Sequence, residues 1–158
     1  MPARSTEGRL SGLRHVAGPF YFMCLLFVLI PAVDMATNSW PLRLDDVGWR
    51  FGTAGLLSGF LLTPLLGMVL AVAGAHVMGH SRTVLVLGVL SALGAAALIG
   101  IAAVFTLDAL QLHPQVSPEG QFSYRVGAIR AWAKTGVVAI ALIWLAIASF
   151  RAPRLQER

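Results

Sequence analysis

Four long apolar stretches constrain the fold of this chain more than any other feature. They cover about residues 16–34, 53–77, 83–107 and 128–150 of the 158 residues. A helix needs about 20 apolar residues to cross the hydrocarbon core of a bilayer, and each stretch is near or above that length. Because a backbone in lipid must satisfy its own hydrogen bonds, each stretch is predicted to be a transmembrane helix.

The composition supports a membrane protein. Charged residues make up 12% of the chain, whereas a soluble domain carries roughly 25%. The predicted fold class is therefore all-α integral membrane, with one domain spanning residues 1–158. We expect a four-transmembrane-helix bundle built from two N-in helical hairpins, with short basic tails. The first stretch is expected to be retained, because Asp34 would occupy a position of a signal-peptide cleavage site that requires a small residue.

The distribution of Lys and Arg predicts the orientation. With the N-terminus inside, the cytoplasmic side holds Arg4, Arg9, Arg14, Arg82, Arg151, Arg154 and Arg158. The outer side holds the other five, Arg43, Arg50, Arg125, Arg130 and Lys134. The majority of basic residues inside predicts cytoplasmic N- and C-termini, and the short loops and basic tails favour a bacterial inner (cytoplasmic) membrane.

The two halves of the chain share a pattern. After the first stretch come Asp34, Pro41 and the run Trp49-Arg50-Phe51-Gly52, and after the third come Asp108, Pro114 and the run Tyr124-Arg125-Val126-Gly127. The Asp-to-Arg separation is 16 residues in the first half and 17 in the second. A parallel 2+2 internal repeat, of the kind found in transporters, would explain this match, and chance similarity is the alternative.

The repeated charges are candidates for interfacial ion pairs. Asp34 and Asp108 end apolar stretches, and Arg50 and Arg125 open the next ones. A helix-end carboxylate can pair with an arginine on the following helix, and this arrangement would place the four residues at the outer interface. The alternative is that all four side chains simply face lipid headgroups.

Small residues recur every fourth position in the two central stretches. The predicted helix-packing residues are Gly55, Gly59, Gly67, Gly88, Ala92, Ala96 and Gly100. Gly55 and Gly59 form a GxxxG motif, which allows membrane helices to approach closely. We expect the two small faces to meet each other, or one of them to bind a partner protein. Pro64 is expected to kink the second stretch.

Few residues are candidates for cofactor binding, metal binding or catalysis. His76 and His80 are four residues apart and are weak candidates for cofactor binding, but no third ligand accompanies them, so no metal site is predicted. Cys24 is the only cysteine and is interpreted as a packing residue. We find no catalytic motif and no ionisable residue in the middle of an apolar stretch. No catalytic residue and no cofactor is predicted, although lipid or pigment contacts are compatible with the pattern.

These observations favour a non-catalytic accessory or structural subunit of a larger membrane complex, respiratory, photosynthetic or similar. Its expected partners are other integral membrane proteins, further copies of the chain and the lipid bilayer. Nucleic acid is not expected, because the basic residues lie at segment ends and do not form one face. A small oligomeric carrier or pore is the first alternative, and a redox or quinone-linked membrane protein is the second.

Overall fold

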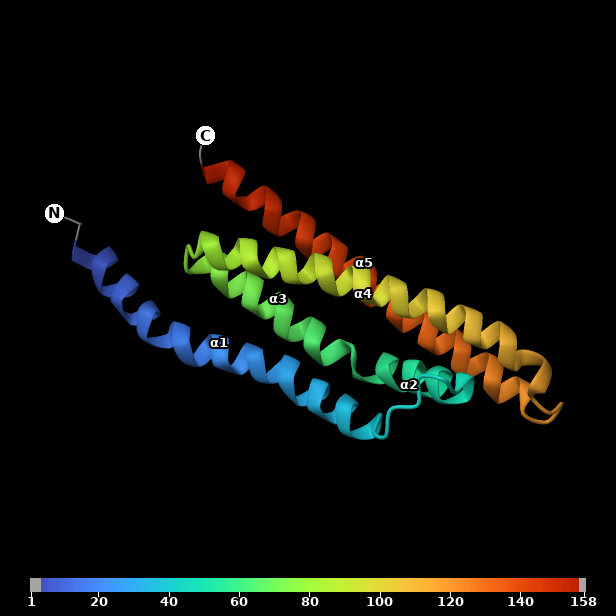
Figure 1. Ribbon diagram of the computed structural model, residues 1–158. Helices are drawn as coiled ribbons and strands as arrows, with labels where there is room; N and C mark the ends of the chain where they lie inside the picture. Colours follow the sequence, from blue (N-terminus) through green and yellow to red (C-terminus); the bar gives the residue numbers. More distant parts are fainter. Residues whose placement is uncertain (1–3, 157–158) are drawn as a thin grey trace.

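The computed structural model describes the backbone of residues 4–156 and the side chains of residues 16–151. All regular secondary structure in this part of the chain is helical (Figure 1), and it contains no strand. The elements are α1 (Arg4–Asn38), α2 (Val47–Phe60), α3 (Leu62–Val77), α4 (Ser81–Leu112), the short 3-10 helix η1 (His113–Gln115) and α5 (Gln121–Gln156). The prediction of an all-helical chain is confirmed.

Three helical segments are long and apolar enough to cross a membrane. They are Val16–Asn38, Ser81–Gln115 and Gln121–Arg151. Helices α2 and α3 meet the same criteria only as a pair, because a bend of 43° separates them. The described chain therefore has three candidate spans, or four if the bent pair is one broken span. This result supports a multi-pass membrane protein.

The helices extend beyond the apolar stretches. Helix α2 begins at Val47 because the Asp46 carboxylate accepts a hydrogen bond of 3.1 Å from the backbone N–H of Trp49, which caps the helix N-terminus. Hydropathy predicts the part of a helix that lipid can surround, whereas capping groups set its ends.

Five of the basic residues used to predict the orientation have side chains outside the described part of the chain. They are Arg4, Arg9, Arg14, Arg154 and Arg158.

The break between α2 and α3 lies at Leu61, three residues before Pro64. A proline has no N–H to donate to the carbonyl four residues earlier, and its ring collides with that carbonyl. For Pro64 this carbonyl belongs to Phe60, the last residue of α2. The predicted kink is therefore present, one turn before the proline.

Helices α4 and α5 make the most extensive contact in the molecule, and α2 packs against both. The buried positions of α4 alternate between steps of four and three residues, at Val84, Gly88, Ser91, Ala95 and Leu98. Most steps in α5 follow the same alternation, at Ala131, Thr135, Val138, Leu142, Ala146 and Ser149. This spacing keeps one stripe of each helix facing the other, as in coiled coils. Helix α1 packs along α3.

The small-residue faces are arranged differently from the expectation. A Cβ atom added at Gly67 would lie 2.8 Å from the carbonyl oxygen of Cys24 on α1, and one at Gly88 would lie 2.8 Å from Cβ of Ser149 on α5. The glycines of α3 and α4 thus contact α1 and α5, and the two small faces do not meet each other. A strict four-residue spacing rotates about 40° per step around a helix. Successive small residues therefore turn away from the face that contacts the neighbouring helix.

The remaining predicted packing residues are not buried against a neighbouring helix in the described chain. Ala92, Ala96 and Gly100 are exposed on α4. A Cβ atom added at Gly55 or Gly59 on α2 would find no atom within 4 Å.

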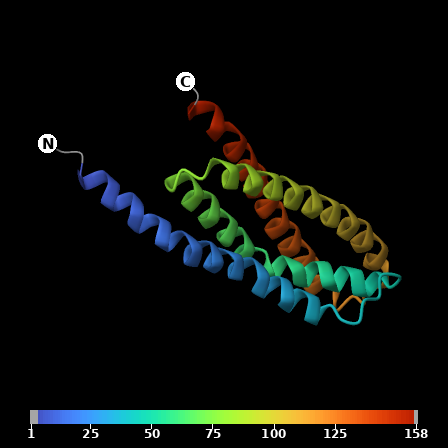
Figure 2. The same ribbon diagram turned by 60° about the vertical axis from the view of Figure 1, so that its left-hand side comes forward.

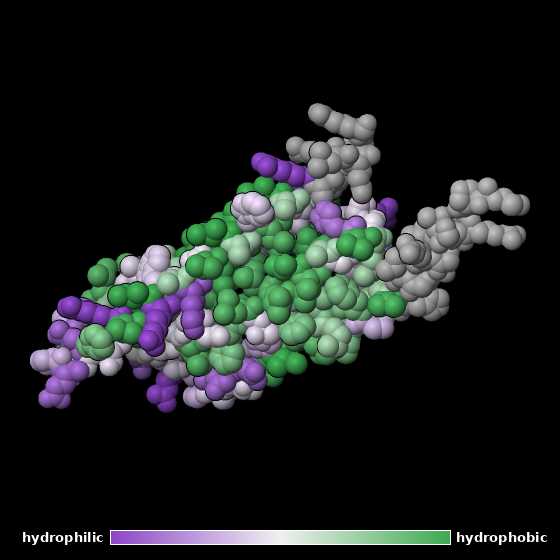
Figure 3. Space-filling view, turned by 180° about the vertical axis from the view of Figure 1, so that it is seen from behind, coloured by the Kyte–Doolittle hydropathy of each residue, from purple (hydrophilic) through white to green (hydrophobic). Residues whose placement is uncertain are grey.

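The chain termini and the long loops lie at opposite ends of the molecule. The start of α1 and the end of α5 lie at the same end as the α3–α4 turn, and the α1–α2 and α4–α5 loops lie at the other (Figures 1 and 2). We call the second end the loop end. Hydrophobic side chains cover the middle of the face seen in Figure 3, and hydrophilic residues gather towards the ends. This distribution is what a bilayer would require.

Candidate functional site

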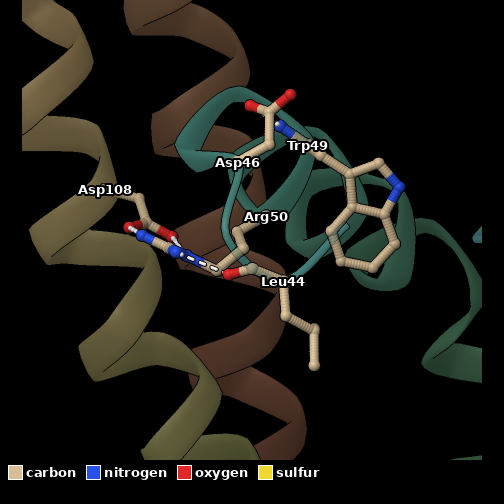
Figure 4. Close-up of polar contacts among 5 residues, drawn as sticks. All are labelled: Leu44, Asp46, Trp49, Arg50 and Asp108. Carbon is tan, nitrogen blue, oxygen red and sulfur yellow. Dashed lines mark hydrogen bonds and ion pairs between the residues drawn. The ribbon is translucent and has the colours of Figure 1, made fainter. Parts of the chain in front are cut away.

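The most distinctive group of polar contacts lies at the loop end, between α2 and α4 (Figure 4). Two nitrogens of Arg50 donate to the Asp108 carboxylate, Nη2 to Oδ1 at 2.7 Å and Nε to Oδ2 at 3.1 Å. The third nitrogen, Nη1, donates to the backbone carbonyl of Leu44 at 2.7 Å. One arginine therefore joins α2, α4 and the α1–α2 loop through a bidentate, charge-assisted pair.

Burial distinguishes Asp108 from the other acidic residues. Its exposed fraction is 2%, and it is the one charged residue classed as buried within residues 16–151. A buried carboxylate is unfavourable unless it is paired and hydrogen-bonded, and Arg50 provides both. The Arg50 side chain remains 28% exposed, so the pair is buried on the Asp108 side and open on the arginine side.

The structure brings together two of the four residues predicted to form ion pairs. Arg50 from the first half of the chain pairs with Asp108 from the second half. Asp34 and Arg125 are exposed, and neither forms an ion pair within the described residues. The predicted pairing within each half is therefore not the pairing observed. The cause is the packing of α2 against α4, which brings Arg50 to Asp108, whereas α1 packs along α3.

An aromatic stack lies next to the ion pair. The Phe51 ring lies between those of Phe105 and Tyr124, with centroid separations of 4.8 and 5.0 Å and interplanar angles of 12° and 18°. The Tyr124 hydroxyl also donates a hydrogen bond of 2.6 Å to the carbonyl of Ala109. The stack joins α2, α4 and α5 at the level of the Arg50–Asp108 pair.

This stack was not predicted from the sequence. One clue to it was present, because Phe105 precedes Asp108 by three residues and therefore lies on the same face of α4. Which aromatic ring on another helix would meet that face depended on how the helices pack.

A cavity of about 490 Å³ lies beside the ion pair. Most of its walls come from α2 and α4, with Met35 of α1 and Leu44 of the α1–α2 loop. The residues of α2 are Trp49, Arg50, Thr53, Ala54 and Leu57. The residues of α4 are Ala97, Gly100, Ile101, Val104, Phe105 and Asp108. The surface of the cavity is almost entirely apolar, although Arg50 and Asp108 are among the residues that border it. Small-molecule sites are concave and mostly apolar, and they also carry a few polar groups that orient the ligand.

The two candidate histidines lie at the opposite end of the molecule and do not share a helix face. Helix α3 ends at Val77, and Gly79, with a φ of +70°, turns the chain before His80. Nδ1 of His76 lies 3.2 Å from the Val72 carbonyl, and Nδ1 of His80 lies 3.0 Å from the Tyr21 hydroxyl. Within the described residues, no group of three His, Cys, Asp or Glu side chains could hold a metal ion.

Comparison of the chain with protein-family models, with curated proteins and with solved structures finds no match. The function is therefore inferred from the helices, the ion pair and the cavity themselves.

Proposed function

We propose that the chain crosses a bacterial inner membrane four times, as a four-helix bundle with cytoplasmic N- and C-termini. Two observations support this topology. The bend of 43° leaves α2 and α3 running onward and does not reverse the chain. The start of α1 and the end of α5 lie at one end of the molecule, as an even number of spans requires (Figure 1). The seven-to-five distribution of basic residues favours the cytoplasm for that end.

In this membrane the chain acts as a non-catalytic accessory subunit that packs against a neighbouring membrane protein. The observation that carries this proposal is the unoccupied small-residue face of α2. Cβ atoms built at Gly55 and Gly59 would meet nothing within 4 Å. Lipid tails are as apolar as leucine, so membrane helices associate mainly where small residues permit close approach. The open glycine face is therefore suited to a transmembrane helix of another chain.

The interior of the bundle also favours a packing role. Ser91 and Ser149 are fully buried, and each hydroxyl donates to the carbonyl four residues earlier in its own helix. Within the described residues, no buried side-chain polar atom lacks a hydrogen-bond partner. A path for ions or protons through the bundle would need polar groups that can bind a passing ion.

The test is purification of the tagged protein from its source membrane in a mild detergent, followed by mass measurement of the intact particle. Gly59→Leu should remove a stoichiometric partner, because a Cβ atom at this position meets nothing within 4 Å and the larger side chain would fill space that a closely packed partner helix needs. Ala73→Leu is the matched control, since Ala73 is exposed on α3, in the same bent pair of helices. This control should retain the partner.

Either of two results would overturn the subunit proposal. One is that the wild-type protein elutes as a single chain with no partner. The other is that Gly59→Leu and Ala73→Leu retain the partner equally. Circular dichroism of each variant establishes that loss of a partner does not arise from unfolding.

A small carrier is the second candidate, and the cavity beside the broken α2–α3 pair favours it. A carrier must expose its site to each side of the membrane in turn. Ala54→Cys, in a chain with Cys24→Ala, would then react with an impermeant maleimide applied from either side. A packing subunit predicts reaction from the loop end only.

A further inference from the structure

Two basic residues of α5 lie on an exposed helix face inside a candidate membrane span. Arg130 and Lys134 belong to the span Gln121–Arg151, and both side chains are exposed. They are four residues apart, so they lie on the same side of the helix. Neither forms an ion pair within the described residues. A charged side chain in a membrane span is costly and usually pairs with an opposite charge, so this face favours a carboxylate of another chain.

Helix α1 carries an exposed carboxylate inside its own candidate span. Asp34 lies in Val16–Asn38, its side chain is exposed, and it forms no ion pair within the described residues. Asp108 is paired with Arg50. The remaining described carboxylates lie in loops and are Asp45, Asp46 and Glu119. Helix α1 lies at the edge of the bundle in both ribbon views (Figures 1 and 2), where a second molecule can reach it.

The packing of α5 on α4 gives the depth of the two basic residues. A Cβ atom built at Gly88 would lie 2.8 Å from Cβ of Ser149, and one at Gly94 would lie 3.4 Å from Cδ1 of Leu142. The two helices are therefore antiparallel in a defined register. Because each helix rises by about 1.5 Å per residue, continuing this register brings Lys134 opposite residue 102 of α4.

Asp34 lies at a similar depth. Its neighbour Met35 borders the cavity at the loop end together with Gly100 and Ile101 of α4. Asp34 and Lys134 are therefore both level with the same part of α4. They belong to different faces of one molecule, because α1 packs along α3 whereas α5 packs against α4. In two copies that lie side by side in one membrane, the carboxylate of one copy and the lysine of the other would be level.

Exposed apolar side chains extend this match along both helices. Met23 and Ile30 of α1 are seven residues apart and more than half exposed, and Ile30 precedes the carboxylate by four residues. Trp144 and Val137 of α5 are also seven residues apart and more than half exposed, and Val137 follows the lysine by three residues. A seven-residue spacing keeps side chains on one face of a helix. Because α1 and α5 run in opposite directions, pairing the charges places Ile30 near Val137 and Met23 near Trp144, and a thioether packs favourably against an aromatic ring.

We propose that copies of the chain associate side by side in the membrane, α1 of one copy against α5 of the next, with Asp34 pairing with Arg130 and Lys134. A symmetric contact between two α5 faces is disfavoured, because like charges would meet. The α1–α5 contact joins unlike surfaces, so it continues into a ring or a row of copies. This inference rests on the proposed topology, and it does not require the partner protein of the subunit proposal.

Disulfide cross-linking in the membranes of the expressing cells tests the predicted register. Ile30→Cys combined with Val137→Cys, in a chain with Cys24→Ala, should give covalent dimers and longer oligomers on oxidation. The two single-cysteine variants are the matched controls and should remain monomeric on a denaturing gel, because each position meets the other one and not its own copy. Equal cross-linking of a single variant and the pair would contradict the proposed interface.

Charge reversal tests the ion pair itself, by analytical ultracentrifugation of the purified chain in a mild detergent. Asp34→Lys, and separately Arg130→Glu with Lys134→Glu, should each raise the dissociation constant at least about tenfold, equivalent to about 1.4 kcal/mol. A mixture of the two variants should associate again, because each variant then offers the other an opposite charge. Arg125→Glu is the matched control and should have little effect, because Arg125 is exposed on α5 about 140° around the helix from Arg130.

A sample diluted to the monomer separates association from folding. There Asp34→Lys should leave the unfolding midpoint unchanged, because Asp34 forms no ion pair within the described residues of its own chain. Circular dichroism of each variant establishes that lost association does not arise from unfolding.

Several outcomes would overturn the proposal. They are a wild-type chain that stays monomeric, an association that neither charge reversal weakens, and a mixture of folded variants that does not associate. Loss of a different membrane protein from the Arg130→Glu and Lys134→Glu variant, with a monomeric wild-type chain, would assign the basic face to that protein. Failure of the subunit proposal would appear in a different experiment, at Gly59 of α2. Maleimide labelling of a cysteine in each loop would reveal a wrong topology independently.

Discussion

The helices that follow the two loops at the loop end, α2 and α5, share a pattern near their start and then differ. Each carries in its first two turns an aromatic residue, an arginine, an apolar residue and a glycine, at 49–52 in α2 and at 124–127 in α5. Helix α5 runs unbroken for 36 residues, whereas α2 ends after 14 residues and the chain bends by 43° into α3. Arg50 of α2 forms the ion pair with Asp108, whereas the corresponding Arg125 of α5 is exposed.

One residue accounts for the difference in helix continuity. Counting from the shared arginine, Pro64 of the first half corresponds to Ala139 of the second. Ala139 is buried in the core of the bundle with Val138 and Leu142. Similar sequence near the start of α2 and α5 therefore does not determine how either helix continues or which helix it contacts.

The largest effect is expected from transferring the break to the second half. Ala139→Pro would remove the bond from the backbone N–H of residue 139 to the Thr135 carbonyl, and it should cost about 3 kcal/mol or more. Thermal unfolding in detergent, followed by circular dichroism, measures the loss. Gln121→Pro at the first position of the same helix is the control and should be tolerated, because that N–H has no partner within the helix. Equal stability of the two variants would contradict this explanation of the break.

The reverse substitution, Pro64→Ala, should reduce the bend of 43°. It restores an N–H for the Phe60 carbonyl, so α2 and α3 can join. Spin labels on exposed positions at either side of the break, Leu56 and Val69, would report the change as a longer distance between them.

A smaller effect is expected where a glycine touches a neighbouring helix. Gly67→Ala places a Cβ atom 2.8 Å from the Cys24 carbonyl oxygen, and such overpacking costs about 1–3 kcal/mol. Gly59→Ala is the matched control on the open face and should stabilise the isolated chain by roughly 0.5–1 kcal/mol, because alanine favours helix more than glycine does. Unfolding midpoints of the two variants on opposite sides of the wild type would match this expectation. A stabilising Gly67→Ala would show that α1 does not pack on α3 as described.

The smallest effect concerns Phe51, the central ring of the aromatic stack, which has no aromatic counterpart in the second half of the chain. Val126 of α5 stands where α2 has Phe51. Phe51→Val should lower the stability by about 1–2 kcal/mol, since it removes two aromatic pairs. Phe122→Val is the control, because Phe122 is 78% exposed and should contribute little. Tyrosine fluorescence and thermal unfolding measure both variants, and equal midpoints would count against the stack.

Hydropathy was sufficient to predict the helices, because lipid leaves the backbone few alternatives. Pro64 was sufficient to predict a kink. The helix contacts were not predictable in the same way. Small residues at four-residue spacing predicted that α3 and α4 meet through those residues. The two helices are in contact, but the buried stripe of α4 alternates four and three and therefore includes Ser91 and Leu98 instead of Ala92 and Ala96.

The sequence predicted that Arg50 and Asp108 could form ion pairs, but it did not predict that they pair with each other. Arg50 and Asp108 were both recognised as charges at the end of apolar stretches. Their pairing depends on α2 lying against α4, and no local pattern in the chain encodes that placement. The cavity has the same origin, since residues from α1, α2 and α4 form its walls. Where the halves resemble each other, the sequence favoured equivalent pairs within each half, and the packing instead joins the halves to each other.

The most direct test of this account is a double-mutant cycle across the two halves. Arg50→Gln, Asp108→Asn and the double variant are compared by unfolding in detergent, beside a second cycle of Arg50→Gln with Asp34→Asn. The account predicts that the single changes at Arg50 and Asp108 are strongly non-additive, because they share one bidentate contact. Asp34→Asn should have no effect alone and should add independently to Arg50→Gln. Coupling between Arg50 and Asp34, with additivity between Arg50 and Asp108, would show that each half pairs its own charges and would contradict the account.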